Sequence, residues 1–221
     1  MIINPYMFGG IPYNTGLVDF YKGNSTPDDS FGTNNLTLVG GTTYTTGLVG
    51  NAFSFDGVND YATATNNIWN FTGNFSFSFW IYFPSSVAST YIASAFTHSG
   101  SAKGWLIFQN LTSIKLQYYN SGTLKESAYI TTTINTWYHI VLVKKASGNF
   151  ETYKNNGTAA VTVDTGNPNY GTNYASVGAL VDEAFPTGLG FTPMRFQYFR
   201  IYNTALTSTD VSNLYNSGTP I

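Results

Sequence analysis

The sequence predicts an all-β fold in which two antiparallel sheets pack face to face, with one short helix near the C-terminal end. Three observations predict it. Short segments of alternating apolar and polar residues recur along the chain, and turns rich in Gly, Asn and Asp separate them. The length of 221 residues suits one sandwich domain with a single core.

The strongest alternation lies at residues 74–83, which we expect to form the central strand. Because successive side chains of a strand point to opposite faces, one face is apolar throughout and carries Phe75, Phe77, Phe79, Ile81 and Phe83. The other face carries Ser76, Ser78, Trp80 and Tyr82. We expect the phenylalanine face to lie in the core and the second face to be accessible.

The other predicted strands are short runs rich in β-branched and aromatic residues, bounded by turn residues. Asp56-Gly57 and Asn156-Gly157 are two such turns, because Gly and Asn tolerate the positive φ that tight hairpins need. In chain order we expect these strands at residues 17–21, 36–39, 52–56, 61–65, 91–96, 104–109, 114–119, 127–132, 137–145, 150–154, 160–163, 175–180 and 195–202.

A single helix is expected after the last strand. Thr207 and Asp210 have the spacing of a capping box, and Val211 and Leu214 recur behind them at helical spacing. Gly218 then ends the helix.

Residues 1–16 differ from the rest, because Pro, Gly, Tyr and Met interrupt any regular element there. Two interpretations are equally supported. The segment is either an arm that docks on a partner protein, here a virion structural protein, or an edge segment folded over its own sandwich. Residues 17–221 form the sandwich domain in either case.

The composition excludes several classes of function. Only 9% of the residues are charged, the net charge is −2, and the nine basic residues are scattered, so nucleic acid is not an expected partner. The absence of cysteine excludes disulfides and thiolate metal sites. The two histidines cannot build a histidine-rich zinc site. We expect His139 to be a hydrogen-bonded structural residue, and Trp137 on the same strand face to fill core volume.

The sequence shows neither a signal peptide nor the run of ~18 apolar residues that a membrane span requires. Conventional export and membrane insertion are therefore not expected. An Asn-, Thr- and Tyr-rich, charge-poor chain is nevertheless typical of proteins that work outside cells. A virion component, which is assembled in a cytoplasm and carried out on a particle, reconciles the two observations. An extracellular or cell-surface location is the alternative.

Three segments, at residues 51–61, 135–157 and 200–218, occur in a characteristic order around the central strand. Together they resemble the LamG-like jelly rolls, which include laminin-G, pentraxin and concanavalin A-like domains. The resemblance extends over about residues 17–218. It implies a jelly-roll sandwich of one convex and one concave sheet, and it implies binding of carbohydrate or protein rather than catalysis.

The resemblance also raises the question of calcium. Many such relatives hold a structural Ca²⁺ through an Asp after the first strand and acids just before the Arg-Ile-Tyr-Asn segment. Asp28 or Asp29 supplies the first ligand here, but Gln197 and Tyr198 occupy the positions of the acids. Because a site weakens as it loses charge, we expect no calcium and no other cofactor.

Catalysis is not expected either. Glucanases on this architecture carry acids at alternate positions of one strand, so that both carboxyl groups enter the cleft. Asp182 and Glu183 are adjacent and would diverge, and Glu126 and Glu151 are single acids near turns. A polysaccharide-degrading enzyme remains a distant alternative.

Glycan binding is the expected activity, because aromatic rings stack on sugars and planar polar groups bond to their hydroxyls. The alternative for each aromatic residue is a place in a second core layer. The candidate ligand-binding residues are Trp80, Tyr82, Trp105, Gln109, Tyr118, Tyr119 and Asn120. The resemblance to pentraxin-like domains adds Asp182 and Glu183.

We therefore expect a non-catalytic phage virion protein, structural, decorating or fibre-forming, whose outward jelly roll recognises a glycan or a cell surface. The alternative is a free-standing carbohydrate-binding module. Exposed aromatic edges would also be compatible with a homo-oligomer.

Overall fold

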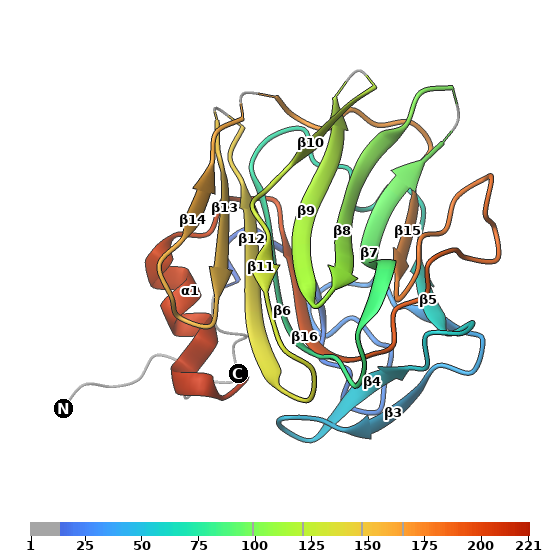
Figure 1. The fold of residues 1–221 in the computed structure, drawn as a ribbon, viewed down its shortest axis with the longest axis vertical. Coiled ribbons are helices and arrows are strands. Elements are labelled where there is room, and N and C mark those ends of the chain that lie inside the picture. Colours follow the sequence, from blue (N-terminus) through green and yellow to red (C-terminus); the bar gives the residue numbers. More distant parts are fainter. Residues whose placement is uncertain (1–13, 99, 121, 147, 165) are drawn as a thin grey trace.

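A computed structural model describes residues 14–98, 100–120, 122–146, 148–164 and 166–221. These residues form two eight-stranded antiparallel sheets and one short α-helix (Figure 1). The predicted two-sheet sandwich is therefore confirmed. The predicted N-terminal arm lies outside the described residues, apart from residues 14–16. None of the described helices is long and apolar enough to cross a membrane.

Sheet A has the central strand β6 at its middle. In spatial order its strands are β14 (Ala160–Thr162), β13 (Phe150–Lys154), β12 (Trp137–Lys144), β6 (Phe75–Tyr82), β16 (Met194–Tyr202), β4 (Asn51–Phe55) and β3 (Thr43–Thr46), with β1 (Leu17–Tyr21) also paired to β16. Strands distant in sequence thus lie side by side in this sheet.

Sheet B is built around the long strands β7, β8 and β9 (Figure 1). In spatial order its strands are β10 (Thr123–Glu126), β9 (Ser113–Asn120), β8 (Lys103–Leu111), β7 (Val87–Thr97), β15 (Tyr174–Val177), β5 (Tyr61–Ala64) and β2 (Thr37–Val39), with β11 (Ile130–Thr131) also paired to β9.

The core lies between the sheets, and the phenylalanine face of β6 is its centre. Phe75, Phe77 and Phe79 are fully buried there, as predicted. Phe77 packs on Trp105 of sheet B, with 4.2 Å between the ring centroids. Close contact between such large rings makes this layer a major source of folding free energy.

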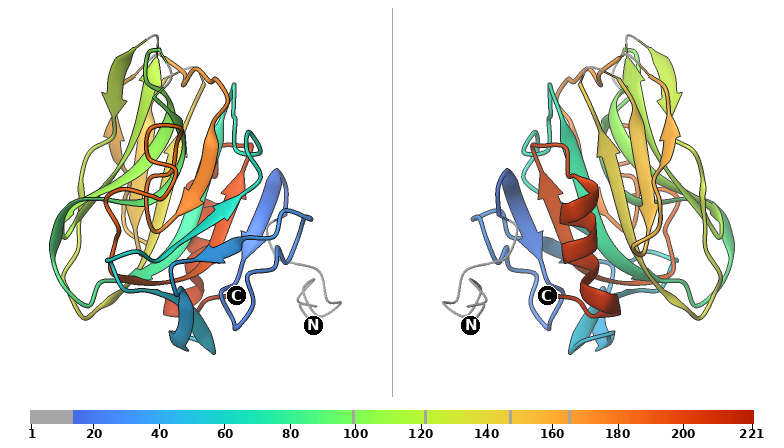
Figure 2. Two further views of the ribbon diagram at one scale, coloured as in Figure 1. Left: turned by 90° about the vertical axis from the view of Figure 1, so that its right-hand side faces the viewer. Right: turned by 90° about the vertical axis from the view of Figure 1, so that its left-hand side faces the viewer.

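The second face of β6 is also buried at Ser76, Ser78 and Trp80, which corrects the expectation that it would be accessible, and only Tyr82 at its end stays partly exposed. The helix α1 (Ser208–Tyr215) lies over the outer side of sheet A (Figure 2, right). Its Tyr215 stacks on Trp80, with 5.8 Å between the ring centroids. Val211 and Leu214 of the helix pack into an apolar cluster on the same side of the sheet. A strand enclosed on both faces tolerates few substitutions.

His139 is the structural residue that its position predicted. It is buried beside Trp80 on the outer side of sheet A, and its Nε2 lies 2.8 Å from Ser78 Oγ. Burial, together with the charge of nearby Arg200, lowers the pKa of His139 to about 3. The imidazole is therefore neutral at physiological pH.

The predicted capping box of α1 is confirmed. Thr207 Oγ1 accepts a hydrogen bond from the Asp210 backbone N–H, while the Asp210 carboxylate accepts one from Thr207 N. These bonds satisfy two backbone donors that the helix start leaves unpaired. The α-helix ends at Tyr215 and a short 3₁₀ turn, Asn216–Gly218, follows it.

Several details differ from the sequence prediction. The strands β3 and β10 were not expected, because their residues are largely exposed and give no clear alternation. The strand β15 ends at Val177 because Gly178 has a φ of +91°, which breaks the extended backbone. Trp137 does not fill the core. It is half-buried on the outer side of sheet A beside Tyr82, with 5.7 Å between the rings.

The burial of β6 predicts the effect of truncating Phe77. We expect Phe77→Ala to lower the free energy of unfolding by about 3–5 kcal/mol, because it leaves a cavity against Trp105. The measurement is urea unfolding followed by tryptophan fluorescence. Phe31→Ala is the matched control, since Phe31 is 41% exposed and its loss should change stability by less than about 0.5 kcal/mol. Equal effects of the two substitutions would contradict the proposed core.

Candidate ligand-binding site

Two predicted ligand-binding residues, Trp105 and Gln109, lie inside the protein. Both are fully buried on β8. Trp105 Nε1 donates to the Trp69 carbonyl at 2.9 Å. The Gln109 amide accepts from Thr90 Oγ1 at 3.1 Å and donates to the Leu111 carbonyl at 2.7 Å. Their polar atoms are therefore satisfied within the protein, and they belong to its core rather than to a binding surface.

Trp80 and Tyr118 are also unavailable to a ligand. Trp80 is 3% exposed beneath Tyr215 of α1. The Tyr118 hydroxyl donates to the Asp164 carboxylate in a fully buried position, and burial raises the pKa of this phenol above its usual range. Of the aromatic candidates, Trp80 lies in a second packed layer beneath α1, whereas Trp105 and Tyr118 belong to the core between the sheets.

Tyr82, Tyr119 and Asn120 remain partly exposed, but the fold separates them. Tyr82 lies on the outer side of sheet A, where its ring lies 4.9 Å from the Arg195 guanidinium. Tyr119 and Asn120 lie at the end of β9 in sheet B. The Tyr119 ring packs against Phe96, with 5.6 Å between the centroids. The predicted aromatic residues therefore do not form one site.

Asp182 organises the loop in which it lies. Its side chain is fully buried, and Oδ1 accepts hydrogen bonds from the backbone N–H groups of Ala184 and Phe185 at 2.8 and 2.9 Å. Its other oxygen pairs with His98 Nδ1. Because both carboxylate oxygens have partners within the protein, Asp182 stabilises the loop and offers no free oxygen to a ligand.

Glu183, the next residue, points elsewhere, as expected for adjacent side chains. It is exposed, and its carboxylate accepts a hydrogen bond from Thr97 Oγ1 at 2.6 Å. This contact joins the loop after β15 to the end of β7. Glu183 is thus a predicted site residue that lines a pocket in the described part of the chain.

The Glu183 pocket has a volume of about 480 Å³ and lies where β7 ends and β8 and β15 begin. That volume is within the range of small-ligand sites. Its lining residues are Thr97, Lys103, Gly171, Thr172, Tyr174 and Glu183.

A glycine lies at the rim of this pocket. A Cβ on Gly171 would lie 3.3 Å from Thr97 Cγ2, a slightly tight contact, and 3.6 Å from Lys103 Cδ, an ordinary one. The space between Thr97 and Lys103 would therefore accommodate a small side chain here with only a small shift of Thr97.

The lining combines four kinds of group: a carboxylate, an ammonium, two hydroxyls and a phenol ring. Lys103, Thr172 and Tyr174 were not predicted. Lys103 and Tyr174 begin strands, and Thr172 precedes one. No pattern in the sequence predicts that residues near 103 and residues near 174 lie close together. That proximity follows from the pairing of Phe96 with both Tyr174 and Gly104 in sheet B.

A second polar cluster, the Lys115 cluster, lies on the outer face of sheet B. Lys115 Nζ lies 2.5 Å from a Glu126 oxygen, Gln117 Nε2 donates to the same oxygen at 3.0 Å, and the Tyr129 ring lies 4.4 Å from Lys115 Nζ. Burial alone would raise the pKa of Glu126, but hydrogen bonds from Lys115 and Gln117 lower it. Glu126, expected to be a single acid, is therefore held in an ion pair.

Asp29, a predicted calcium ligand, is surrounded by donors. It accepts hydrogen bonds from the backbone N–H groups of Phe20 and Phe31 at 2.9 and 3.0 Å. Backbone N–H groups carry a partial positive charge, so they stabilise the Asp29 carboxylate and disfavour a cation beside it. Asp28 is exposed and accepts from Thr26 Oγ1 at 2.5 Å. No group of three or more His, Asp or Glu among the described residues is arranged to hold a metal. The expectation of no calcium stays a prediction.

Gln197 stands where relatives are expected to carry an acid, and it has a structural role. It is fully buried, and Oε1 accepts from Leu48 N at 2.6 Å while Nε2 donates to the Val49 carbonyl at 3.1 Å. The neutral amide thus holds the loop between β3 and β4, a task that needs both a donor and an acceptor and that a carboxylate could not perform.

Asp19 lies beside Asp29 and is fully buried. Trp69 Nε1 and Asn34 Nδ2 both donate to it at 2.7 Å. Burial raises the pKa of Asp19 to about 6, against the effect of these hydrogen bonds. Burial alone would also raise the pKa of Asp29, but hydrogen bonds from backbone N–H groups lower it below its ordinary value. The two carboxyl groups therefore ionise at different pH values, and neither lines a described pocket.

Comparison with known proteins shows which family and which solved structures the chain resembles. Residues 56–212 match the model of a family described as the concanavalin A-like lectin/glucanases superfamily. No curated protein matches the sequence. The binding domain of Paraclostridial Mosquitocidal Protein 1 superposes with a TM-score of 0.73 at 16% identity, covering 91% of this chain and 52% of that one.

Two further structures are of similar shape. Domain 4 of AbnA, a GH43 extracellular arabinanase from Geobacillus stearothermophilus, solved in complex with arabinotriose, gives a TM-score of 0.72 at 17% identity, covering 90% of this chain and 98% of that one. The binding domain of botulinum neurotoxin DC in complex with SialylT gives 0.71 at 16% identity, covering 92% and 52%. The chain spans about half the length of both toxin domains. At these identities the similarity shows a shared fold.

The raised pKa of Asp19 predicts how stability depends on pH. A carboxyl group whose pKa is higher when folded stabilises the protein below its unfolded pKa of about 3.9 and loses that contribution as pH rises through 6. We expect the free energy of unfolding to fall between pH 4 and 7 by an amount on the order of 1–3 kcal/mol that Asp19→Asn removes. Urea midpoints at each pH measure it. Asp28→Asn, at an exposed site, should leave the slope unchanged. An unchanged slope in Asp19→Asn would contradict the assignment.

Proposed function

Because the chain belongs to the concanavalin A-like lectin/glucanases superfamily, we propose that it is a non-catalytic module that binds a saccharide in the Glu183 pocket. One observation carries the proposal. A pocket of about 480 Å³ brings a tyrosine ring, a carboxylate and an ammonium group together at one end of sheet B. This combination offers an apolar stacking surface beside groups that bond to hydroxyls.

Each group has a distinct task in this proposal. The Glu183 carboxylate accepts hydrogen bonds from sugar hydroxyls, and the Lys103 ammonium donates to sugar oxygens. The Tyr174 ring covers the C–H face of the sugar. Thr172 completes the polar rim, since its hydroxyl both donates and accepts. Thr97 is buried and acts through Glu183. The hydrogen bond from Thr97 to Glu183 fixes the carboxylate before a ligand arrives, which reduces the entropy lost on binding.

The structural neighbours support the proposal at the level of fold. One is an arabinanase domain in complex with arabinotriose, and another is a toxin binding domain in complex with SialylT. Their ligands belong to those proteins. For this chain they support the view that such a sandwich presents sites for ligands.

A polysaccharide-degrading enzyme is less well supported. Hydrolysis of a glycosidic bond generally needs two carboxyl groups, about 5–5.5 Å apart for retention of configuration. The lining of the Glu183 pocket contains one carboxylate. Glu151 lies elsewhere, in an ion pair with Lys145 and a hydrogen bond from Tyr153. The pocket therefore suits binding without bond cleavage.

The location of the module is a further part of the proposal. We place it on a virus particle, as a decoration or fibre protein of a phage that faces outward. The low charge content and the Asn-, Thr- and Tyr-rich composition support this location. The alternatives are a free-standing carbohydrate-binding module and an extracellular or cell-surface protein.

The binding proposal is tested on a glycan array followed by calorimetry with the glycan that binds best. We expect Glu183→Gln to weaken binding by about tenfold or more, because a hydrogen bond to a charged group contributes about 1.5–3 kcal/mol. We expect a similar loss for Tyr174→Ala, because it removes the ring that covers the sugar. Glu126→Gln, in the Lys115 cluster, is the matched control and should bind normally. Unchanged binding in Glu183→Gln together with loss in Glu126→Gln would move the site to the Lys115 cluster and contradict the proposal.

The virion proposal has a separate test. We expect deletion of residues 1–16 to abolish incorporation into particles and to leave glycan affinity unchanged. Mass spectrometry of purified particles measures incorporation. Normal incorporation of the truncated chain would contradict the docking role of the arm.

A further inference from the structure

The loop that carries Glu183 is held at the end of β7 by two neighbouring contacts. His98 Nδ1 pairs with Asp182 Oδ2, and Thr97, the residue before His98, donates to Glu183. Two adjacent residues of one segment therefore contact two adjacent acids of the other. Because Glu183 directly follows Asp182, the contact that holds Asp182 also limits where the Glu183 carboxylate can lie.

This loop is folded around the buried charge of Asp182. Leu180 N donates to the Leu189 carbonyl at 2.9 Å and Leu189 N donates back to the Leu180 carbonyl at 2.8 Å, so the loop closes as a hairpin. Inside it, Asp182 Oδ1 accepts from the backbone N–H groups of Ala184 and Phe185. A carboxylate taken out of water in this way is costly unless a positive charge compensates it.

His98 can supply that positive charge. Its side chain is 43% exposed while that of Asp182 is fully buried, so the imidazole exchanges protons with solvent. Its ring packs edge-on against Phe96 and Phe185, with 4.9 and 5.7 Å between the centroids, which holds it beside the loop. Histidine is the side chain that changes charge between about pH 5 and 8, and a hydrogen bond between two charged groups is the stronger form.

The other ionisable side chains around this pair come from four elements. Glu183 lies in the loop, Lys103 begins β8, and Tyr91 and Tyr119 belong to β7 and β9. Burial, together with the nearby Tyr119 and Asp182, raises the pKa of Tyr91. Carboxyl, ammonium and phenol groups ordinarily titrate outside the range of about pH 5 to 8. Within this range the change of charge beside the loop therefore falls on His98.

We propose that His98 is a positioning residue that makes the Glu183 pocket pH-dependent, because its protonated form holds the Asp182 loop, and with it Glu183, in the binding position. His98 is not part of the pocket lining, so it acts through Asp182. The charged imidazole gains its partner only when the loop is closed, so closure is favoured at acidic pH and weakens as the imidazole loses its proton. The effect on affinity rests on the proposed function, whereas the effect on the loop needs no ligand.

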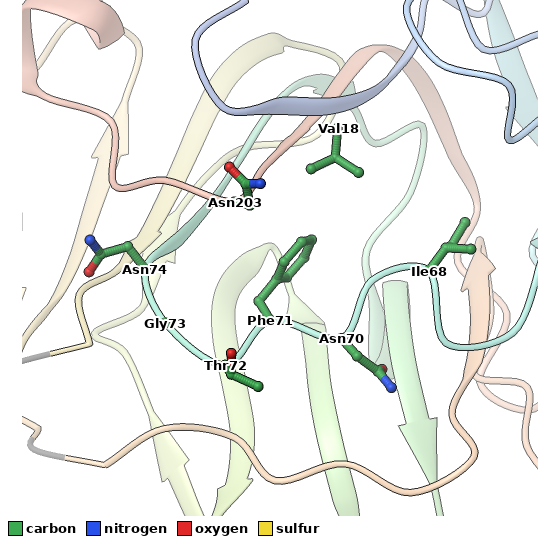
Figure 3. A pocket seen from close by; sticks show the side chains of 8 residues that line it. All are labelled: Val18, Ile68, Asn70, Phe71, Thr72, Gly73, Asn74 and Asn203. Carbon is green, nitrogen blue, oxygen red and sulfur yellow. The ribbon is translucent and has the colours of Figure 1, made fainter.

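Two buried groups must be separated from His98 in a test. His139 stays neutral, because burial lowers its pKa to about 3. Asp19 does titrate, because burial raises its pKa to about 6. Its neighbour Val18 lines a different pocket, toward which the Phe71 ring points and in which no lining residue carries a charge (Figure 3). Backbone signals from residues 72–74 in that lining therefore report Asp19 and not His98.

The test is NMR of the ¹⁵N-labelled full chain between pH 5 and 8, without a ligand. We expect the backbone amide signals of Ala184 and Phe185 to titrate together with the His98 imidazole. After correction for the intrinsic rate, these amides should exchange with solvent at least about threefold faster at pH 8 than at pH 5. His98→Gln keeps a side-chain donor without the charge, so it should abolish both effects.

Asp19→Asn is the matched control. It should remove the pH dependence of the signals from residues 72–74 and leave those of Ala184 and Phe185 unchanged. Loop signals that stay constant from pH 5 to 8 in the unaltered chain would overturn the inference, as would a titration of these signals that survives His98→Gln.

Calorimetry with the glycan that binds best on the array links the loop to the site. We expect the unaltered chain to bind it at least about threefold more tightly at pH 5.5 than at pH 8, and His98→Gln to bind equally at both. Equal affinity of the unaltered chain at both pH values would overturn the positioning role and leave the Glu183 pocket in place. If no glycan binds at either pH, the proposed function fails, and the ligand-free titration still decides whether His98 controls the loop.

Discussion

The enclosure of β6 on both faces is the constraint on which the rest of the structure depends. On one side Phe75, Phe77 and Phe79 fill the space between the sheets. On the other, α1 covers the strand and Tyr215 stacks on Trp80. Because both sides of the middle of sheet A are occupied, this sheet offers no aromatic platform at its centre. Accessible pockets therefore lie where strands end and loops begin.

This arrangement separates stability from recognition. Most of the large rings contribute to the core, whereas the Glu183 pocket brings a carboxylate, an ammonium group, hydroxyls and one tyrosine ring together at the ends of strands. Two hydrogen bonds between Asn67 and Asn173 tie the loop before β6 to the loop before β15. One end of a rigid sandwich can thus carry a pocket whose lining changes without disturbing the core.

Local patterns in the sequence were sufficient to predict the sandwich, the phenylalanine face and the capping box of α1, because each depends on residues close together in the chain. The burial of Trp80 was not predictable, since it depends on contact with Tyr215, which lies more than a hundred positions away. The same limit applies to the site. Glu183 was predicted from a resemblance, but its neighbours Lys103 and Tyr174 meet it only through strand pairing in sheet B.

The central claim is that a strand closed on both faces leaves recognition to the loop end of the molecule. Hydrogen–deuterium exchange with and without a saturating saccharide tests it most directly. We expect the amides of β6 and β12 to exchange slowest in the free protein and to be unaffected by the ligand, while amides near residues 97–103 and 171–183 gain protection. Rapid exchange in β6, or protection confined to α1 and Trp80, would contradict the account.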